Sequence, residues 1–165
     1  MNHTKIILLF FTLVAFVFTS CNEKDDSTTE WWKTNQEAYD AKKTDPEWTL
    51  LETIDGPSGV YYKDITEPGT EIGNEYPLQT ASVVVNYTGK YHTDQVFDSG
   101  KKSTFTVNGV VRGFGVALQH MRTGQKWEVC IPYYLGYGAS GTTYIQGYTT
   151  LFFEIELLKI DQYPK

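Results

Sequence analysis

The chain has 165 residues, with 14 Lys and Arg against 20 Asp and Glu, which gives a formal net charge of −6 at pH 7. An acidic chain without a basic stripe is not expected to bind nucleic acid. The length fits one domain with a short extension, and the 41% of hydrophobic residues suffices for a core that needs no disulfide or metal.

The chain begins with a segment typical of an export signal. Lys5 is followed by an apolar run from Ile6 to Phe18 and by the small residues Thr19 and Ser20, directly before Cys21. The run is too short to cross a bilayer as a helix, which takes roughly 20 apolar residues. A cysteine at this junction resembles a bacterial lipoprotein signal, so we expect cleavage before Cys21 and lipidation of its thiol. A plain secretory signal followed by an incidental cysteine is the alternative.

The segment after the signal predicts a tether and a short helix. The stretch NEKDDSTT is polar and charged, as in a solvated linker, although its acidic residues also resemble an export tag of surface lipoproteins. Ser27 and Glu30 have the spacing of a capping box, and a helix is predicted from about Thr29 to Lys43. The pair Trp31 and Trp32 would anchor this helix on the domain or dip into a lipid interface, and the sequence leaves both open.

The rest of the chain alternates short β-rich runs with glycine-containing segments. Strands are predicted over Val60–Ile65, Ser82–Tyr87, Lys126–Pro132 and Thr150–Ile160. Only Val111–Met121 has a helical pattern. One helix among antiparallel strands predicts an α+β domain, in which a curved antiparallel sheet, a half-barrel, wraps around that short helix.

These elements divide the chain into three parts. We expect a lipoprotein signal peptide at residues 1–20, a lipidated cysteine with the polar tether and short helix at residues 21–50, and the β-rich domain at residues 51–165. Cys130 would then have no cysteine in the chain to pair with, and we interpret it as a small strand residue.

Six fragments of the β-rich part, taken in order, resemble one known family. They are SGVYYKDI from Ser58, VVVNYTGKY from Val83, VFDSG from Val96, VVRGFGVALQHMRTGQKWEVCIP from Val110, YLGYGASG from Tyr134 and LFFEIELLKI from Leu151. This series resembles the FKBP family of peptidyl-prolyl cis-trans isomerases. The resemblance implies rotation of X-Pro peptide bonds without a covalent intermediate, a cofactor or a metal.

The chemistry of that reaction explains why rings would surround a lone acid. An X-Pro bond resists rotation by about 18–20 kcal/mol, because twisting breaks the amide resonance and leaves a less polarised carbonyl. A water-poor aromatic pocket therefore favours the twisted state. By resemblance, the residues that bind the substrate are Tyr87, Phe105, Val110, Val111, Phe114, Ile145 and Phe153. Ordinary core packing is the alternative for these side chains.

The resemblance also assigns roles to three catalytic residues. The hydroxyl of Tyr137 would donate a hydrogen bond to a substrate carbonyl, and the ring of Phe97 would line the pocket. Asp98 would accept a hydrogen bond from Tyr87 and orient the polar rim. A turn-forming aspartate at Asp98-Ser99-Gly100 is the alternative.

Three features depart from the family pattern. Phe114 stands where the family usually has tryptophan, and the segment between Asp98 and Phe105 is shorter than usual. Ile145-Gln146-Gly147 replaces the usual isoleucine-proline-proline, so the loop above the pocket is expected to be less rigid. These departures concern activity and substrate preference more than fold.

Two functions remain open. The first is an isomerase that assists the folding of extracytoplasmic proteins, held by a lipid anchor at the bacterial cell envelope, on the periplasmic or the surface face of the outer membrane. The second is an FKBP-like chaperone or peptide-binding module with weak catalysis. In both cases the expected partners are proline-containing polypeptides and the membrane, the protein is expected to be a monomer, and macrolide inhibitors are expected ligands by resemblance.

Overall fold

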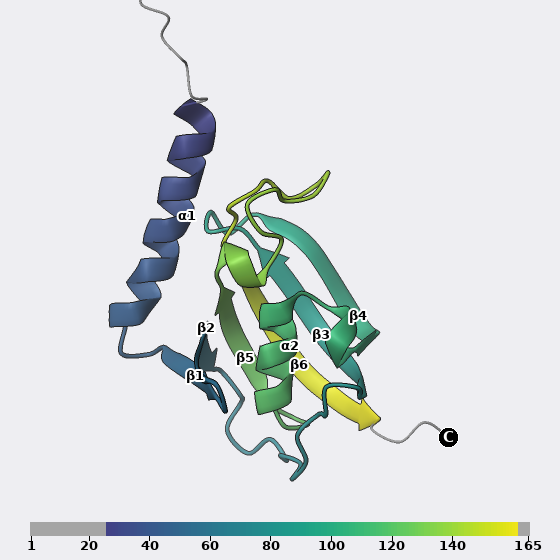
Figure 1. Cartoon of the computed structure of the whole chain (residues 1–165). Helices are drawn as coiled ribbons and strands as arrows, with labels where there is room; N and C mark the ends of the chain where they lie inside the picture. The colour runs from purple at the N-terminus through teal and green to yellow at the C-terminus, as the bar shows by residue number, and fades with distance from the viewer. Residues whose placement is uncertain (1–25, 162–165) are drawn as a thin grey trace, which may run out of the picture.

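Six antiparallel strands form one curved sheet with an α-helix on each face (Figure 1). The computed structural model describes residues 26–161, so the expected signal peptide and Cys21 lie outside the described residues. The strands are β1 (Thr49–Thr53), β2 (Gly56–Asp64), β3 (Ser82–Lys90), β4 (Val96–Thr106), β5 (Lys126–Ile131) and β6 (Leu151–Asp161). Their order across the sheet is β1-β2-β5-β6-β3-β4. The helices are α1 (Asp26–Thr44) and α2 (Arg112–His120). The predicted α+β class is thus confirmed.

Alternation along the strands creates the core. On β5, Trp127, Val129 and Ile131 are buried on the face that carries α2. Cys130 points to the opposite face and is also fully buried. Since α1 covers that second face, both surfaces of β5 are shielded. The four predicted strands are all present, as β2, β3, β5 and β6.

Helix α2 lies inside the curve of the sheet because its sequence buries one face. Phe114, Ala117 and Leu118 recur at helical spacing and are almost fully buried. Gly113 faces β5 so closely that a β-carbon there would collide with the side chain of Ile131. The absence of that carbon lets the helix backbone approach the sheet. The predicted helix at Val111–Met121 is confirmed, one residue shorter at each end.

Helix α1 stands beside β1 and β2 in Figure 1, and it packs against β5 on the face of the sheet opposite α2. It begins at Asp26, before the predicted start at Thr29, and ends at Thr44. Trp31 donates a hydrogen bond to Thr149 and faces the domain, whereas Trp32 keeps 43% of its surface exposed. The first of the two interpretations of this pair, docking on the domain, therefore holds for Trp31. Neither described helix combines the length and the apolar character needed to cross a membrane.

Two strands of the sheet were not predicted, and both are edges. β1 begins at Thr49, inside the segment that the sequence assigns to the tether and short helix. β4 contains Asp98-Ser99-Gly100, and Asp98 pairs with Gly89 across the β3–β4 ladder. The alternative of a turn-forming Asp98 was therefore wrong.

The segment between Asp98 and Phe105 is a continuation of β4 with a bulge. Lys101 and Lys102 together lie opposite Asn86, at the point where the register shifts. Lys102 has a positive φ of 51°, and its N–H donates to the side-chain oxygen of Asn86 over 2.9 Å. The bulge shifts the β3–β4 register without breaking β4, so the segment between Asp98 and Phe105 is strand rather than loop.

Candidate active site

Four aromatic rings meet at the N-terminal end of α2. Phe114 lies at their centre, with its ring centroid 5.0 Å from Phe153, 6.3 Å from Tyr87 and 6.4 Å from Phe105. All three pairs are close to perpendicular, the edge-to-face geometry that ring quadrupoles favour. Phe114 and Phe153 are 4% and 6% exposed, whereas Tyr87 and Phe105 are half-buried. The cluster therefore has a buried floor and partly open walls.

Phe97 of β4 extends this ring cluster. Its ring lies 5.6 Å from Phe153 and 5.2 Å from Tyr91. Both phenylalanines pack against Gly89 of β3, where a β-carbon would stand 2.6 Å from Phe97 and 2.7 Å from Phe153. Sequence reasoning missed Gly89 and Tyr91. The available signal was a glycine inside a strand pattern, which marks a close approach.

A polar pair borders the rings. The hydroxyl of Tyr87 donates a hydrogen bond to Asp98 Oδ2 over 2.8 Å. Burial, helped by this bond, raises the pKa of Tyr87 to about 12. Burial and, to a smaller extent, the negative charge of Asp98 raise the pKa of Tyr137, which is 38% exposed. Both phenols therefore keep their protons near neutral pH, and the Tyr87 hydroxyl donates to Asp98.

The remaining expected residues lie on the segments that lead to the cluster. Val110 and Val111 precede α2 and pack, partly buried, against the same core. Ile145 is 6% exposed and belongs to the loop between residues 136 and 150. The Ile145 N–H donates to Thr142 Oγ1 over 3.0 Å, and Ile145 accepts a bond from the Thr142 N–H over 2.7 Å. Short-range bonds thus fold this proline-free loop.

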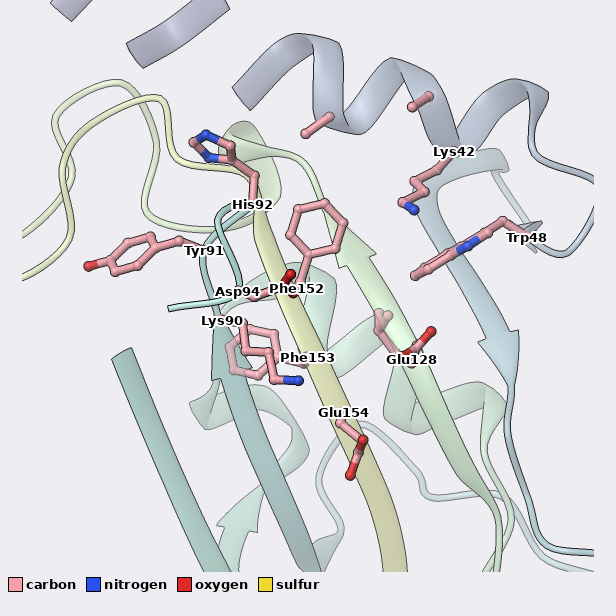
Figure 2. Close-up of a pocket in the computed structure, with 13 residues that line it drawn as sticks. Lys42, Trp48, Lys90, Tyr91, His92, Asp94, Glu128, Phe152, Phe153 and Glu154 are labelled. Carbon is pink, nitrogen blue, oxygen red and sulfur yellow. The ribbon is translucent and has the colours of Figure 1, made fainter. Parts of the chain in front are cut away.

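A cavity of about 350 Å³ lies on the opposite face of the sheet, beneath α1 (Figure 2). Phe152 and Trp48 supply its apolar surface, and Lys42 Nζ sits 4.5 Å from the centroid of the Trp48 ring. Its charged side chains are Lys42, Lys90, Asp94, Glu128 and Glu154. The cavity lining thus carries charges of both signs, two lysines and three carboxylates. The ring cluster around Phe114 lies on the other face of the sheet, where Phe114 and Phe153 are buried and Tyr87 and Phe105 are partly exposed.

The described residues contain no candidate metal site. No group of three or more His, Cys, Asp or Glu side chains within residues 26–161 could hold a metal ion. Both ring nitrogens of His120 contact main-chain oxygens, of Val116 at 2.7 Å and of Glu52 at 2.8 Å. His120 therefore ties the end of α2 to β1.

Comparison with known proteins gives consistent matches. The family described as FKBP-type peptidyl-prolyl cis-trans isomerase matches residues 73–158, more than half of the chain. The FKBP-type 22 kDa peptidyl-prolyl cis-trans isomerase of Escherichia coli is 46% identical over 89 residues, 51% of this chain and 43% of that protein. The outer membrane protein MIP of Legionella longbeachae is 39% identical over 109 residues, 63% of this chain and 45% of that protein.

Solved structures agree with these matches. The crystal structure of a peptidyl-prolyl cis-trans isomerase from Pseudomonas syringae pv. tomato superposes with a TM-score of 0.71 at 29% identity. The match covers 82% of this chain and 96% of that one. The chain spans about half the length of the curated relatives it matches.

Proposed function

Because this chain belongs to the family of FKBP-type peptidyl-prolyl cis-trans isomerases, we propose that it accelerates rotation about X-Pro bonds in exported polypeptides. The observation that carries this proposal is the cluster of rings around Phe114, bordered by the bonded pair of Tyr87 and Asp98. This arrangement offers an apolar seat and hydrogen-bond donors. Rotation about an X-Pro bond makes and breaks no covalent bond, so it requires no nucleophile and no general acid or base.

The proposed mechanism is preferential binding of the twisted bond. The prolyl ring rests on Phe114 and Phe153, with Phe97 as a wall. Here the carbonyl before proline leaves water as the bond twists, and its lower polarity in the twisted state makes that transfer favourable. Tyr137 donates a hydrogen bond to a substrate carbonyl, and Asp98 keeps the Tyr87 hydroxyl oriented at the rim. Each tenfold acceleration requires about 1.4 kcal/mol of preferential stabilisation of the twisted state. A few such contacts therefore suffice for an acceleration of several orders of magnitude.

Envelope location is part of the proposal. The apolar run before Cys21 supports export and lipidation of that thiol, and one relative is named as an outer membrane protein. We expect a radiolabelled fatty acid to be incorporated in the wild type and lost in Cys21→Ala. Equal labelling of the two proteins would refute the proposal that Cys21 carries a lipid anchor.

The test of the activity is cis-trans exchange in short X-Pro peptides, measured by NMR exchange spectroscopy. Tyr137→Phe loses one hydrogen bond of about 1 kcal/mol and should slow catalysis severalfold. Phe97→Ala removes a wall of the site and should slow it further. Tyr144→Phe is the matched control, because Tyr144 is 89% exposed. Uncatalysed rates in the wild type and in all three variants would refute the isomerase proposal.

A peptide-binding module with weak catalysis is the second candidate. Phe114 favours it, because phenylalanine gives a smaller floor than the tryptophan usual in the family and lacks the indole N–H. In that case X-Pro peptides would bind, with affinity reduced by Phe97→Ala, but exchange would stay close to the uncatalysed rate. A macrolide inhibitor would be expected to compete with the peptide in either case.

A further inference from the structure

We propose that helix α1 positions the two loops beside the proline site, through Trp31 and Asn35, and thereby sets how tightly the site holds its peptide. The inference rests on the proposed function, since it concerns the same site. Trp31 and Asn35 are positioning residues in this proposal, because neither belongs to the ring cluster.

The two loops each carry a part of the site. The loop after β3 contains Tyr91, whose ring packs on Phe97 at 5.2 Å. The loop between residues 136 and 150 contains Tyr137 and the buried Ile145. One direct bond joins the loops, from the Tyr91 hydroxyl to the main-chain oxygen of Tyr144 over 3.2 Å. A displacement of either loop would therefore reach residues of the site.

Trp31 contacts both loops. Its indole N–H donates to Thr149 Oγ1 over 3.1 Å, and that hydroxyl donates in turn to the main-chain oxygen of Gln146 over 2.6 Å. Its ring meets Tyr91 and His92 edge-on, with centroid distances of 5.9 Å and 5.2 Å. The side chain of Trp31 thus contacts the end of the loop at residues 136–150 and the start of the loop after β3.

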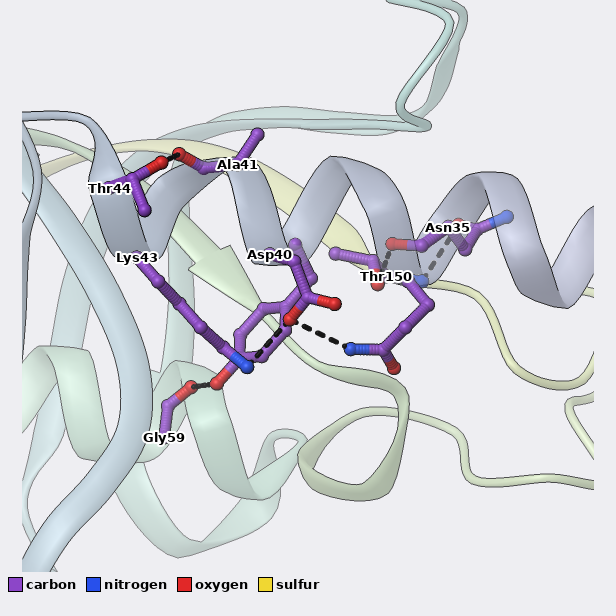
Figure 3. A network of polar contacts seen from close by, with 9 residues as sticks. Asn35, Asp40, Ala41, Lys43, Thr44, Gly59 and Thr150 are labelled. Carbon is purple, nitrogen blue, oxygen red and sulfur yellow. Dashed lines mark hydrogen bonds and ion pairs between the residues drawn. The ribbon is translucent and has the colours of Figure 1, made fainter.

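Asn35, one helical turn later, fixes the point where the second loop joins the sheet (Figure 3). Its side-chain oxygen accepts from the Thr150 N–H over 2.9 Å, and its main-chain oxygen accepts from Thr150 Oγ1 over 2.9 Å. Its amide group donates to the main-chain oxygen of Trp31 over 2.8 Å, so the two anchors are joined. Asn35 is 0% and Thr150 2% exposed, and water cannot replace these bonds without opening the contact.

The other half of α1 is held independently of the loops. Tyr39 is 5% exposed, and its hydroxyl donates to the main-chain oxygen of Gly59, in β2, over 2.8 Å. Its ring also packs edge-on against Tyr61 of β2. Weakening the contact at Trp31 should therefore leave the helix docked, so an effect on the site can be separated from loss of the helix.

The physical consequence is a lower entropic cost of binding. A loop already held in place loses less freedom when a peptide binds, so its affinity is higher. The loop segment Gln146-Gly147 has no proline to restrict it, and its backbone is crowded enough that a β-carbon on Gly147 would collide with Ala139. The contacts from α1 therefore add to the short-range bonds between Thr142 and Ile145 in restraining this loop.

The neighbouring tryptophans provide a matched test. Trp31→Phe keeps an aromatic ring but removes the N–H that reaches Thr149, whereas Trp32→Phe changes a side chain that is 43% exposed. Thr149→Val removes the same bond from the loop side. Backbone amide NMR signals of residues 144–150 are compared first without peptide, and KM and kcat for an X-Pro peptide are measured next, with circular dichroism to confirm folding.

We expect Trp31→Phe and Thr149→Val to shift or broaden the loop signals and to raise KM by about three- to tenfold, with kcat within about twofold of the wild type. Trp32→Phe should change none of these. Unchanged loop signals in both loop-contact variants, or altered signals with an unchanged KM, would overturn the inference. Similar effects from Trp32→Phe would overturn it too. If the wild type proves inactive, the isomerase proposal fails, and the loop signals together with the dissociation constant of the peptide still decide this inference.

Discussion

The bond network of Asn35 allows a stability prediction with a stated magnitude. Replacing Asn35 by leucine keeps the approximate volume but removes the acceptor of the Thr150 N–H. A buried N–H left without a partner costs about 1–3 kcal/mol, and the lost bond to Trp31 costs about 0.5–1 kcal/mol. The higher helix propensity of leucine returns a few tenths of a kcal/mol. We therefore expect Asn35→Leu to lower the free energy of unfolding by about 2 kcal/mol.

Urea denaturation followed by tryptophan fluorescence measures this loss. With an m value of about 2 kcal/mol/M, the midpoint should fall by roughly 1 M. Gln36→Ala is the control, because the neighbouring Gln36 bonds only to Asp40 within the same helix over 3.1 Å, and its effect should stay within about 0.5 kcal/mol. Equal midpoints for Asn35→Leu and wild type, at equal m, would refute the docking of α1 through Asn35.

Three further results are expected. Gly89→Ala should raise KM for X-Pro peptides severalfold in a folded protein, because the new β-carbon displaces the ring of Phe97; an unchanged KM would contradict the close approach. Tyr87→Phe should have a lower free energy of unfolding than wild type at pH 9, and this difference should disappear between about pH 10 and 12. The pKa of Tyr87 is raised in the folded state, so the stability that it gives is lost as the pH rises from the unfolded to the folded pKa. Cys130 should react with a thiol reagent only after unfolding, in a Cys21→Ser background, because it is buried and burial raises its thiol pKa; rapid native labelling would oppose this.

Sequence patterns predicted the central elements of the fold because their signals are local. On β5, Trp127, Val129 and Ile131 alternate with residues of the opposite face, and α2 buries Phe114, Ala117 and Leu118 at helical spacing. β4 was missed because it is an edge strand, largely exposed, and its bulge at Lys101 and Lys102 breaks the period of two. An edge strand depends on pairing with its neighbour more than on burial, and pairing leaves little trace in a single sequence.

Some residues of the site could likewise be predicted from the sequence, and others could not. The ring residues were identified by resemblance, and the structure brings Tyr87, Phe97 and Phe114 together with their neighbours. The contacts of α1 could not be predicted, because Trp31 and Thr149 are 118 positions apart and no periodicity relates them. The helical spacing of Trp31, Asn35 and Tyr39 predicted the helix, although Ser27 lies inside α1 and is not its N-cap. Which of its faces would reach the loop depended on tertiary packing.

The bulge in β4 limits how well this edge of the sheet can pair with the strand of another chain. β4 is an eleven-residue strand at an open edge of the sheet, with backbone groups that a foreign strand could pair with. Two consecutive lysines interrupt that edge near its middle, and the left-handed backbone at Lys102 spoils the straight ladder that cross-β growth requires. This edge of the sheet is therefore a poor template for the growth of a fibre.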